Sequence, residues 1–297
     1  MCVLFLLFLT GCQKREVAQD SRPLIAVSIV PQQWFVSRIG GDRVRTLVLA
    51  GPGQNPHNYE PTPKQVSGLA EAAVWILSGA EFEISLCPKI EKLFPNLPII
   101  DGTAGVTFRT LEEHDHDDDG DHDHNDDHSI SSIDIDRHTW LGSQPAKILA
   151  AHIWTALSAL DPADAEYYNN NFAALVQDID GEFSALRQDL APLKGSNVFV
   201  YHPSFGYFLD EFGIRQQAVE TGGKTPGPRE LSRLIELAKE EEPTAIFVQA
   251  QFPVSAAQTV ADAVGAKVIS LDPLAPDWLE NIHYMGNIIK LGVRNEE

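Results

Sequence analysis

Apolar residues recur every three or four positions over residues 161–192, which is the spacing of one helix face. Asp161 is a suitable N-cap, Pro162 fits the first turn, and Pro192 ends the pattern. The spacing predicts one helix of roughly 45 Å, longer than most helices of globular proteins. Its apolar positions are Ala165, Tyr168, Phe172, Leu175, Ile179, Phe183, Leu186 and Leu190.

On either side of this stretch, short apolar runs alternate with helical patterns. Before it, strands are predicted at residues 24–30, 44–49, 74–77 and 97–100, and helices at 31–39, 62–72, 82–93 and 143–160. After it, strands are predicted at 197–201, 215–219, 245–249 and 267–271, and helices at 204–212, 229–241, 255–264 and 277–291. Such alternation predicts an α/β fold with parallel sheets. We expect two similar (β/α) lobes, residues 23–160 and 193–297, joined by the long helix.

The first twelve residues form an apolar run that is too short to span a bilayer and is typical of an export signal. Leu9-Thr10-Gly11-Cys12 resembles the bacterial lipobox, in which the cysteine is lipidated. We therefore expect a signal peptide at residues 1–11, a lipid on Cys12 and a polar tether over 12–22. A buried N-terminal strand is the alternative, which the polar run after Cys12 disfavours. Cys87 then has no partner for an intrachain disulfide.

Composition fits a soluble globular protein of two domains, with 297 residues, 43% of them hydrophobic and 22% charged. The formal net charge of -20 argues against a nucleic-acid partner. Half of that charge lies in residues 112–128, which hold ten acids, five histidines and no lysine or arginine. This stretch has no apolar residue to bury, so a disordered loop is predicted over 112–130.

Three histidines and one aspartate fall where the loops of the two predicted sheets converge. His57 lies in a proline-rich loop after the second strand, His202 and Asp272 directly follow strands, and His138 precedes a helix. Open α/β sheets bind ligands beyond the carboxyl ends of their strands. Three imidazoles and a carboxylate suit tetrahedral Zn²⁺. A single loop histidine is usually only a solvated side chain, but three histidines and an aspartate in converging loops indicate a site.

The chain resembles the zinc-binding components of bacterial ABC importers, the ZnuA/TroA-like solute-binding proteins. The resemblance runs from residue 23 to the C-terminus and implies two (β/α) lobes joined by one rigid helix, with the metal held in the cleft between them. It assigns the metal ligands to His57, His138, His202 and Asp272. The fourth ligand varies in the family, so Glu60 or water are alternatives to Asp272. The motifs that carry the resemblance are Pro56-His57-Asn58-Tyr59-Glu60-Pro61-Thr62-Pro63, Asp136-Arg137-His138-Thr139-Trp140-Leu141, Tyr201-His202-Pro203-Ser204-Phe205, Gly223-Lys224, Pro228-Arg229-Glu230-Leu231, Phe247-Val248-Gln249-Ala250-Gln251-Phe252 and Ser270-Leu271-Asp272-Pro273-Leu274.

Zinc is favoured over manganese because imidazole suits Zn²⁺, whereas Mn²⁺ prefers carboxylates. Manganese-binding relatives tend to have an acid where this chain has His202. Glu60 and the histidines of the acidic run are possible auxiliary ligands for weak metal capture. Those histidines are His114, His116, His122, His124 and His128.

The function predicted is binding and not catalysis: a monomeric lipoprotein of the periplasm or cell surface delivers Zn²⁺ to an ABC permease. A manganese-binding homologue and a metal-dependent adhesin are alternatives. A zinc hydrolase is a further alternative, but it needs an open coordination position with a general base beside it. The sequence contains no His-Glu-x-x-His motif.

Overall fold

The computed structural model describes residues 20–111, 135–220, 227–252 and 254–293. The predicted signal peptide, Cys12, most of the tether, the five histidines of the acidic run and Gly223-Lys224 lie outside these residues. The predictions made for them therefore stay predictions. Within the described part of the chain, no helix combines the length and apolar character needed to cross a membrane.

The first lobe is built on a parallel sheet in the order β2-β1-β3-β4. Its central strand β1 is buried along most of its length, as expected for a strand covered on both faces. The strands are β1 (Leu24–Ile29), β2 (Arg45–Ala50), β3 (Val74–Leu77) and β4 (Ile99–Asp101). Its helices are α1 (Val30–Gly40), α2 (Pro63–Glu71) and α3 (Glu81–Leu93), with a 3₁₀ turn η1 (Gly41–Arg43) after α1.

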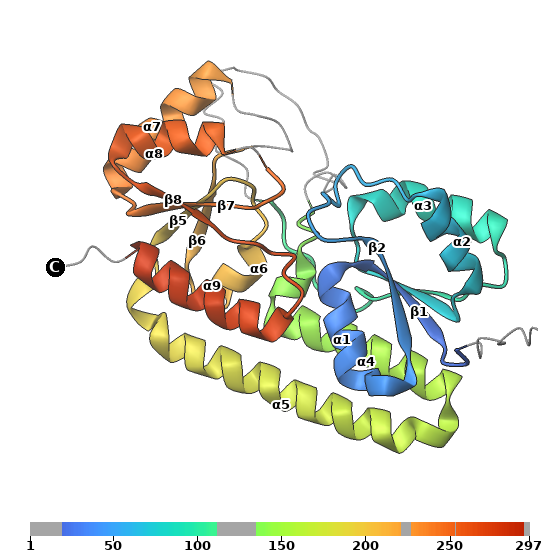
Figure 1. Cartoon of the computed structure of the whole chain (residues 1–297). Coiled ribbons are helices and arrows are strands. Elements are labelled where there is room, and N and C mark those ends of the chain that lie inside the picture. Colours follow the sequence, from blue (N-terminus) through green and yellow to red (C-terminus); the bar gives the residue numbers. More distant parts are fainter. Residues whose placement is uncertain (1–19, 112–134, 221–226, 253, 294–297) are drawn as a thin grey trace, which may run out of the picture.

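The second lobe repeats this plan, with a parallel sheet in the order β6-β5-β7-β8. Its strands are β5 (Asn197–Val200), β6 (Arg215–Ala218), β7 (Ala245–Val248) and β8 (Lys267–Ser270). Its helices are α6 (Gly206–Asp210), α7 (Pro228–Glu241), α8 (Ser255–Val264) and α9 (Trp278–Val293). The predicted α/β class and the repeated lobe are confirmed, and the two sheets lie in separate halves of the molecule (Figure 1).

The predicted helix over 161–192 is wrong at both ends. The chain leaves the first lobe through η2 (Thr139–Leu141) and α4 (Ser143–Leu160), and then makes a 3₁₀ turn η3 (Pro162–Asp164). The long helix α5 spans only Ala165–Asp189, which is about 38 Å at ~1.5 Å per residue. A second 3₁₀ turn, η4 (Ala191–Leu193), follows it. Proline fixes φ and has no amide hydrogen, so each proline lies in a tight turn outside the regular helix.

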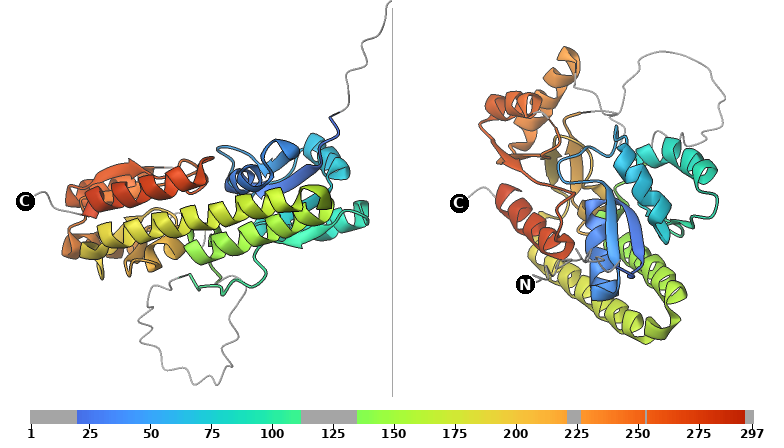
Figure 2. Two further views of the ribbon diagram at one scale, coloured as in Figure 1. Left: turned by 90° about the horizontal axis from the view of Figure 1, so that it is seen from below. Right: turned by 45° about the vertical axis from the view of Figure 1, so that its right-hand side comes forward.

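Helix α5 nevertheless connects the two lobes. It packs against α1 and α4 on the side of the first lobe and against α9 on the side of the second. Figures 1 and 2 show it running beneath both halves of the molecule. The largest cluster of buried apolar side chains continues from one lobe through α5 to the other, and includes Ile25, Phe183 and Trp278. A second cluster lies wholly in the second lobe, around Phe199 and Val260.

Two tryptophans join the lobes by hydrogen bonds close to the predicted metal ligands. Trp140 Nε1 donates to the carbonyl of Pro273 over 2.9 Å, and Trp278 Nε1 donates to the carbonyl of Trp140 over 2.7 Å. Trp140 follows His138 by two residues, and Pro273 follows Asp272. The segments that carry these two predicted ligands are thus held against each other.

Candidate metal centre

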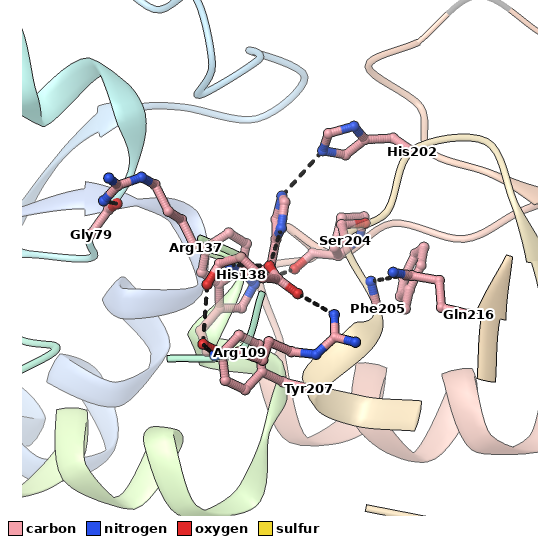
Figure 3. A network of polar contacts seen from close by, with 12 residues as sticks. Gly79, Arg109, Arg137, His138, His202, Ser204, Phe205, Tyr207 and Gln216 are labelled. Carbon is pink, nitrogen blue, oxygen red and sulfur yellow. Dashed lines mark hydrogen bonds and ion pairs between the residues drawn. The ribbon is translucent and has the colours of Figure 1, made fainter. Parts of the chain in front are cut away.

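Three histidines meet between the lobes, each from a different loop. His57 lies in the loop between β2 and α2, His138 lies just before η2, and His202 follows β5. His57 Nε2 is 2.8 Å from His202 Nε2, which is 3.2 Å from His138 Nε2. Figure 3 shows His138 and His202 pointing toward each other across the space between the ribbons. The ligand atoms of all three histidines lie within 4.8 Å of one another, and no other group of this kind occurs in the described ranges.

Local sequence explains why the His57 loop is held in place. The start of α2 is fixed by Thr62, whose hydroxyl accepts a hydrogen bond from the Gln65 backbone, while Pro63 occupies the first helical turn. Gln65 also donates to the carbonyl of Leu49 at the end of β2 over 2.6 Å. Both ends of the loop are therefore attached to regular structure, so His57 is presented by a stiff segment.

A carboxylate faces the outer ring nitrogen of each histidine. Asp136 Oδ1 is 2.8 Å from His138 Nδ1, and Glu81 Oε2 is 3.1 Å from His57 Nδ1. The third carboxylate, that of Glu220, contacts His202 Nδ1. When Nδ1 carries the proton and donates a hydrogen bond to a carboxylate, the Nε2 lone pair is free for a metal, and the ring is held in orientation. The three Nε2 atoms therefore converge in an arrangement that could hold a metal ion.

Electrostatics at the centre favour a neutral His202 imidazole and ionised Glu81 and Asp136 carboxylates. Burial lowers the pKa of His202 well below its ordinary value, and the neighbouring His138 and His57 lower it further. Burial alone would raise the pKa values of Glu81 and Asp136. The hydrogen bonds and charge interactions that both carboxylates make, chiefly with His57 and His138, together outweigh burial, so both carboxyl pKa values lie below their ordinary range.

The second lobe covers His202 with residues from the segment after β7. The Phe252 ring stacks on the His202 ring, with 4.6 Å between ring centroids and an interplanar angle of 23°. The buried Gln249 side chain accepts the His202 backbone N–H over 3.2 Å and donates to the His202 carbonyl over 2.6 Å. Gln249 therefore fixes the backbone of a candidate ligand.

A family profile described as "ZnuA: Zinc-uptake complex component A periplasmic" matches residues 25–291. The chain belongs to the ZnuA family. A solved structure described as "Crystal structure of ZnuA" is 34% identical in sequence, with a TM-score of 0.82, covering 92% of this chain and 100% of that one. The predicted resemblance to ABC-importer solute-binding components is confirmed at the level of the family.

Curated relatives of the ZnuA family share about a quarter of their residues with this chain. The high-affinity zinc uptake system protein ZnuA of Brucella abortus is 28% identical over 299 residues, covering 91% of this chain and 89% of the relative. The zinc-binding lipoprotein AdcA of Streptococcus pneumoniae is 26% identical over 272 residues and 90% of this chain. This chain spans only about half of AdcA, 53% of its length. The periplasmic zinc-binding protein TroA of Treponema pallidum, 17% identical with a TM-score of 0.78 and covering 92% of this chain and 100% of that one, shares the fold.

Two other predicted metal ligands of this ZnuA-family chain do not join the three histidines. Asp272 Oδ1 accepts hydrogen bonds from Gln251 Nε2 over 3.1 Å and from the Leu274 backbone over 2.9 Å. Asp272 thus helps to hold the Phe252 segment and lies outside the cluster of ligand atoms. Glu60 is exposed, and it too lies outside that cluster. The sequence places both residues in the right loops but does not fix where their side chains turn.

The carboxylates that hold His57 and His202 were missed by the sequence analysis, although a signal for both was present. Glu81 is the first residue of α3, close to the end of β3, and Glu220 closely follows β6. Acids that follow the other parallel strands therefore contact the Nδ1 atoms of these two histidines. Asp136 lies two residues before His138 in the sequence, a separation short enough for direct contact.

Proposed function

We propose that this chain is the extracytoplasmic zinc-binding component of an ABC importer, and that His57, His138 and His202 are its metal ligands. The observation that carries the proposal is the convergence of three Nε2 atoms, each on an imidazole held by a carboxylate at Nδ1. Tetrahedral zinc with Zn–N bonds of about 2.0–2.1 Å needs ligand nitrogens roughly 3.3 Å apart. The separations of 2.8 and 3.2 Å require only a small expansion.

Zinc is proposed as the cargo because the three converging ligands are all imidazoles. Mn²⁺ favours oxygen ligands, and the carboxylates beside the site are already engaged with Nδ1 atoms. We assign the fourth position to water, because Asp272 is held by Gln251 and Leu274. The zinc-named relatives of the ZnuA family support the same metal.

The family and the N-terminal sequence support proposals about zinc delivery and membrane attachment. We propose that the loaded protein hands Zn²⁺ to a membrane permease, since the family is described as a component of a zinc-uptake complex. Lipidation of Cys12 would attach the protein to the membrane through the polar tether, as the lipobox-like sequence indicates. We expect the protein to act as a monomer.

Catalysis is disfavoured by the roles of the nearby acids. A zinc hydrolase needs a general base beside the metal-bound water. Glu81, Asp136 and Glu220 instead each direct one carboxylate oxygen at the Nδ1 atom of a histidine. The adhesin and manganese alternatives predict other behaviour: matrix binding, or preference for Mn²⁺ in competition.

Metal analysis of the purified protein tests the proposed cargo. The full chain is prepared without chelator or affinity tag, and its bound metals are quantified before and after competition with Mn²⁺. We expect one tightly held Zn²⁺ per chain that excess Mn²⁺ does not displace. Retention of Mn²⁺ in preference to Zn²⁺ would assign the protein to manganese transport.

Zinc affinity is expected to fall as the pH drops below about 6, by at least tenfold between roughly pH 7 and pH 5. Zinc binds only neutral imidazole, and the reference pKa of histidine is about 6.5, so protons compete with the metal on the acid side. The lowered pKa of His202 keeps that ligand neutral at neutral pH. Dissociation constants measured across this range provide the test, and a flat profile would exclude a site of three histidines.

Deleting residues 113–128 is expected to leave one tight Zn²⁺ site and to abolish weaker additional binding. The run has no apolar side chain to anchor it, so arranging it around an ion costs roughly 1–2 kcal/mol per residue fixed. The cleft ligands instead sit on stiff loops. Calorimetric titration of the intact and shortened proteins should differ only in the weak phase. Loss of the tight phase would place a primary ligand in the deleted run.

A further inference from the structure

Asp136 divides its two carboxylate oxygens between His138 and an arginine. Its side chain is fully buried, and Oδ1 accepts from the His138 backbone over 2.9 Å and lies 2.8 Å from His138 Nδ1. The other oxygen, Oδ2, accepts from Arg109 Nη1 over 2.7 Å. A buried carboxylate is stable only when it is paired and hydrogen-bonded. Arg109 is therefore the charge partner that fixes how Asp136 faces His138.

Arg109 also reaches the second lobe through α6. Its Nε donates to Asp210 Oδ2 over 2.9 Å, and its backbone N–H donates to the Tyr207 hydroxyl over 3.1 Å. The Tyr207 hydroxyl in turn donates to the Asp136 carbonyl over 3.0 Å. Figure 3 shows Arg109, Tyr207 and His138 in one network of polar contacts. One guanidinium thus bridges the residue that orients His138 and the first helix after His202.

Gly206, the first residue of α6, provides the space that this bridge needs. A Cβ atom at Gly206 would lie 1.6 Å from Arg109 Nη1 and 2.2 Å from Arg109 Cζ. Any larger residue at this position would displace the guanidinium. The absence of a side chain at the start of α6 therefore allows the Arg109 guanidinium to occupy this place.

The planar guanidinium suits this place better than an ammonium group would. Arginine presents several N–H donors in a fixed fork, so Nη1 and Nε can contact different carboxylates at once. The Arg109 side chain is only 14% exposed, whereas Asp210 is 53% exposed. Solvent screens the contact with Asp210 more strongly, so the contact with the buried Asp136 is the stronger of the two.

We propose that Arg109 is a positioning residue for the metal centre. It holds the Asp136 carboxylate, and through it the His138 ring, in the orientation that metal binding requires. Its contacts with α6 tie that orientation to the placement of the second lobe, which supplies His202. This inference rests on the proposed function, because it assigns Arg109 a part in the same zinc site.

The main test compares Arg109→Met with Arg187→Met as a matched control. Arg187 Nη2 makes an ion pair of 2.7 Å with Glu211, which joins α5 to the end of α6 without touching the histidines or Asp136. Zinc affinity is measured by competition with a chromogenic chelator, and the Co²⁺-loaded proteins are compared by visible absorption. We expect Arg109→Met to weaken zinc binding by roughly 10-fold, the lower end of the range for losing the direct partner of a ligand, because Arg109 acts through Asp136. We also expect the cobalt spectrum to change. Arg187→Met should leave both unchanged.

Three further variants separate positioning from a general loss of stability. Arg109→Lys should restore part of the affinity, because a single ammonium keeps the charge near Asp136 but loses the fork. Gly206→Ala should weaken zinc binding and alter the cobalt spectrum although all charged groups remain. Asp210→Asn, which removes only the screened contact, should reduce the affinity less than fivefold. Thermal unfolding of each apo protein checks that the fold is retained.

Wild-type zinc affinity and an unchanged cobalt spectrum in folded Arg109→Met would overturn the inference. If Arg109→Met does not fold, the same result in Gly206→Ala overturns it. The outcome is separable from failure of the proposed function. If His202→Ala also leaves zinc binding unchanged, the assignment of the zinc site itself fails. If His202→Ala weakens zinc binding but the Arg109 and Gly206 variants do not, the assigned zinc site is retained and Arg109 has no positioning role.

Discussion

Replacing His202 with alanine is expected to weaken the tight zinc site by roughly 3–4 kcal/mol, a loss of about 100- to 1,000-fold in affinity. The magnitude follows from dividing the ~10–16 kcal/mol of a four-ligand zinc site among its ligands. His202 Nε2 lies 2.8 Å from His57 Nε2 and 3.2 Å from His138 Nε2, so it is the proposed ligand that lies close to both of the others. Competition titration with a chelator of known zinc affinity measures the loss.

Asp272→Asn is the matched control for this prediction. Asparagine keeps an Oδ1 acceptor for Gln251 and the Leu274 backbone, so the Phe252 segment should stay in place. With water as the fourth ligand, zinc affinity should change by less than about fivefold, well below the loss of a direct ligand bond. A loss as large as that of His202→Ala would make Asp272 the fourth ligand. Unchanged tight binding in His202→Ala would remove His202 from the site.

Replacing Trp278 with alanine is expected to destabilise the protein by about 3–5 kcal/mol, the range for removing a large buried aromatic side chain. Trp278 is only 1% exposed, and its ring lies 4.9 Å from that of Phe35 and 6.4 Å from that of Phe183. These contacts join α9 to the first lobe and to α5. The free energy of unfolding, measured by urea denaturation of the apo protein, provides the test.

Leu291→Ala on the same helix is the control for Trp278→Ala. Leu291 is 70% exposed, so its truncation should change stability by less than about 0.5 kcal/mol. Trp278→Phe should fall between the two, because it keeps an aromatic ring in the core but loses the hydrogen bond to the Trp140 carbonyl. A loss below about 1 kcal/mol in Trp278→Ala would contradict a continuous core between the lobes, since creating a buried cavity of this size costs more.

The sequence predicted the strands, and with them the region of the site, because parallel strands have strong local signals. Apolar runs such as Val74–Leu77 are followed by turn residues, here Ser78-Gly79, and helices such as Ser143–Leu160 carry a clear period. The positions of the strand ends then identified His57 and His202 as candidate ligands, although the order of the strands in each sheet was not known. This worked because the carboxyl ends of parallel strands meet at one edge.

The remaining features depend on tertiary contacts that no local pattern encodes. Asp272 lies two residues after β8, yet its carboxylate turns to Gln251 and the Leu274 backbone. Glu81 and Glu220 acquire their roles only when the His57 and His202 rings are brought close to them. The sequence predicts too long a helix because the apolar period continues to Leu190. In the structure, the prolines just beyond the ends of α5 impose 3₁₀ turns.

Anomalous X-ray diffraction at the zinc absorption edge, from crystals of the zinc-loaded full chain, tests the central claim most directly. We predict one strong anomalous peak between the lobes, about 2.0–2.1 Å from the Nε2 atoms of His57, His138 and His202. The Nδ1 atoms of these residues should still face Glu81, Asp136 and Glu220. A principal peak elsewhere, or one bonded to fewer than three of these histidines, would contradict the account.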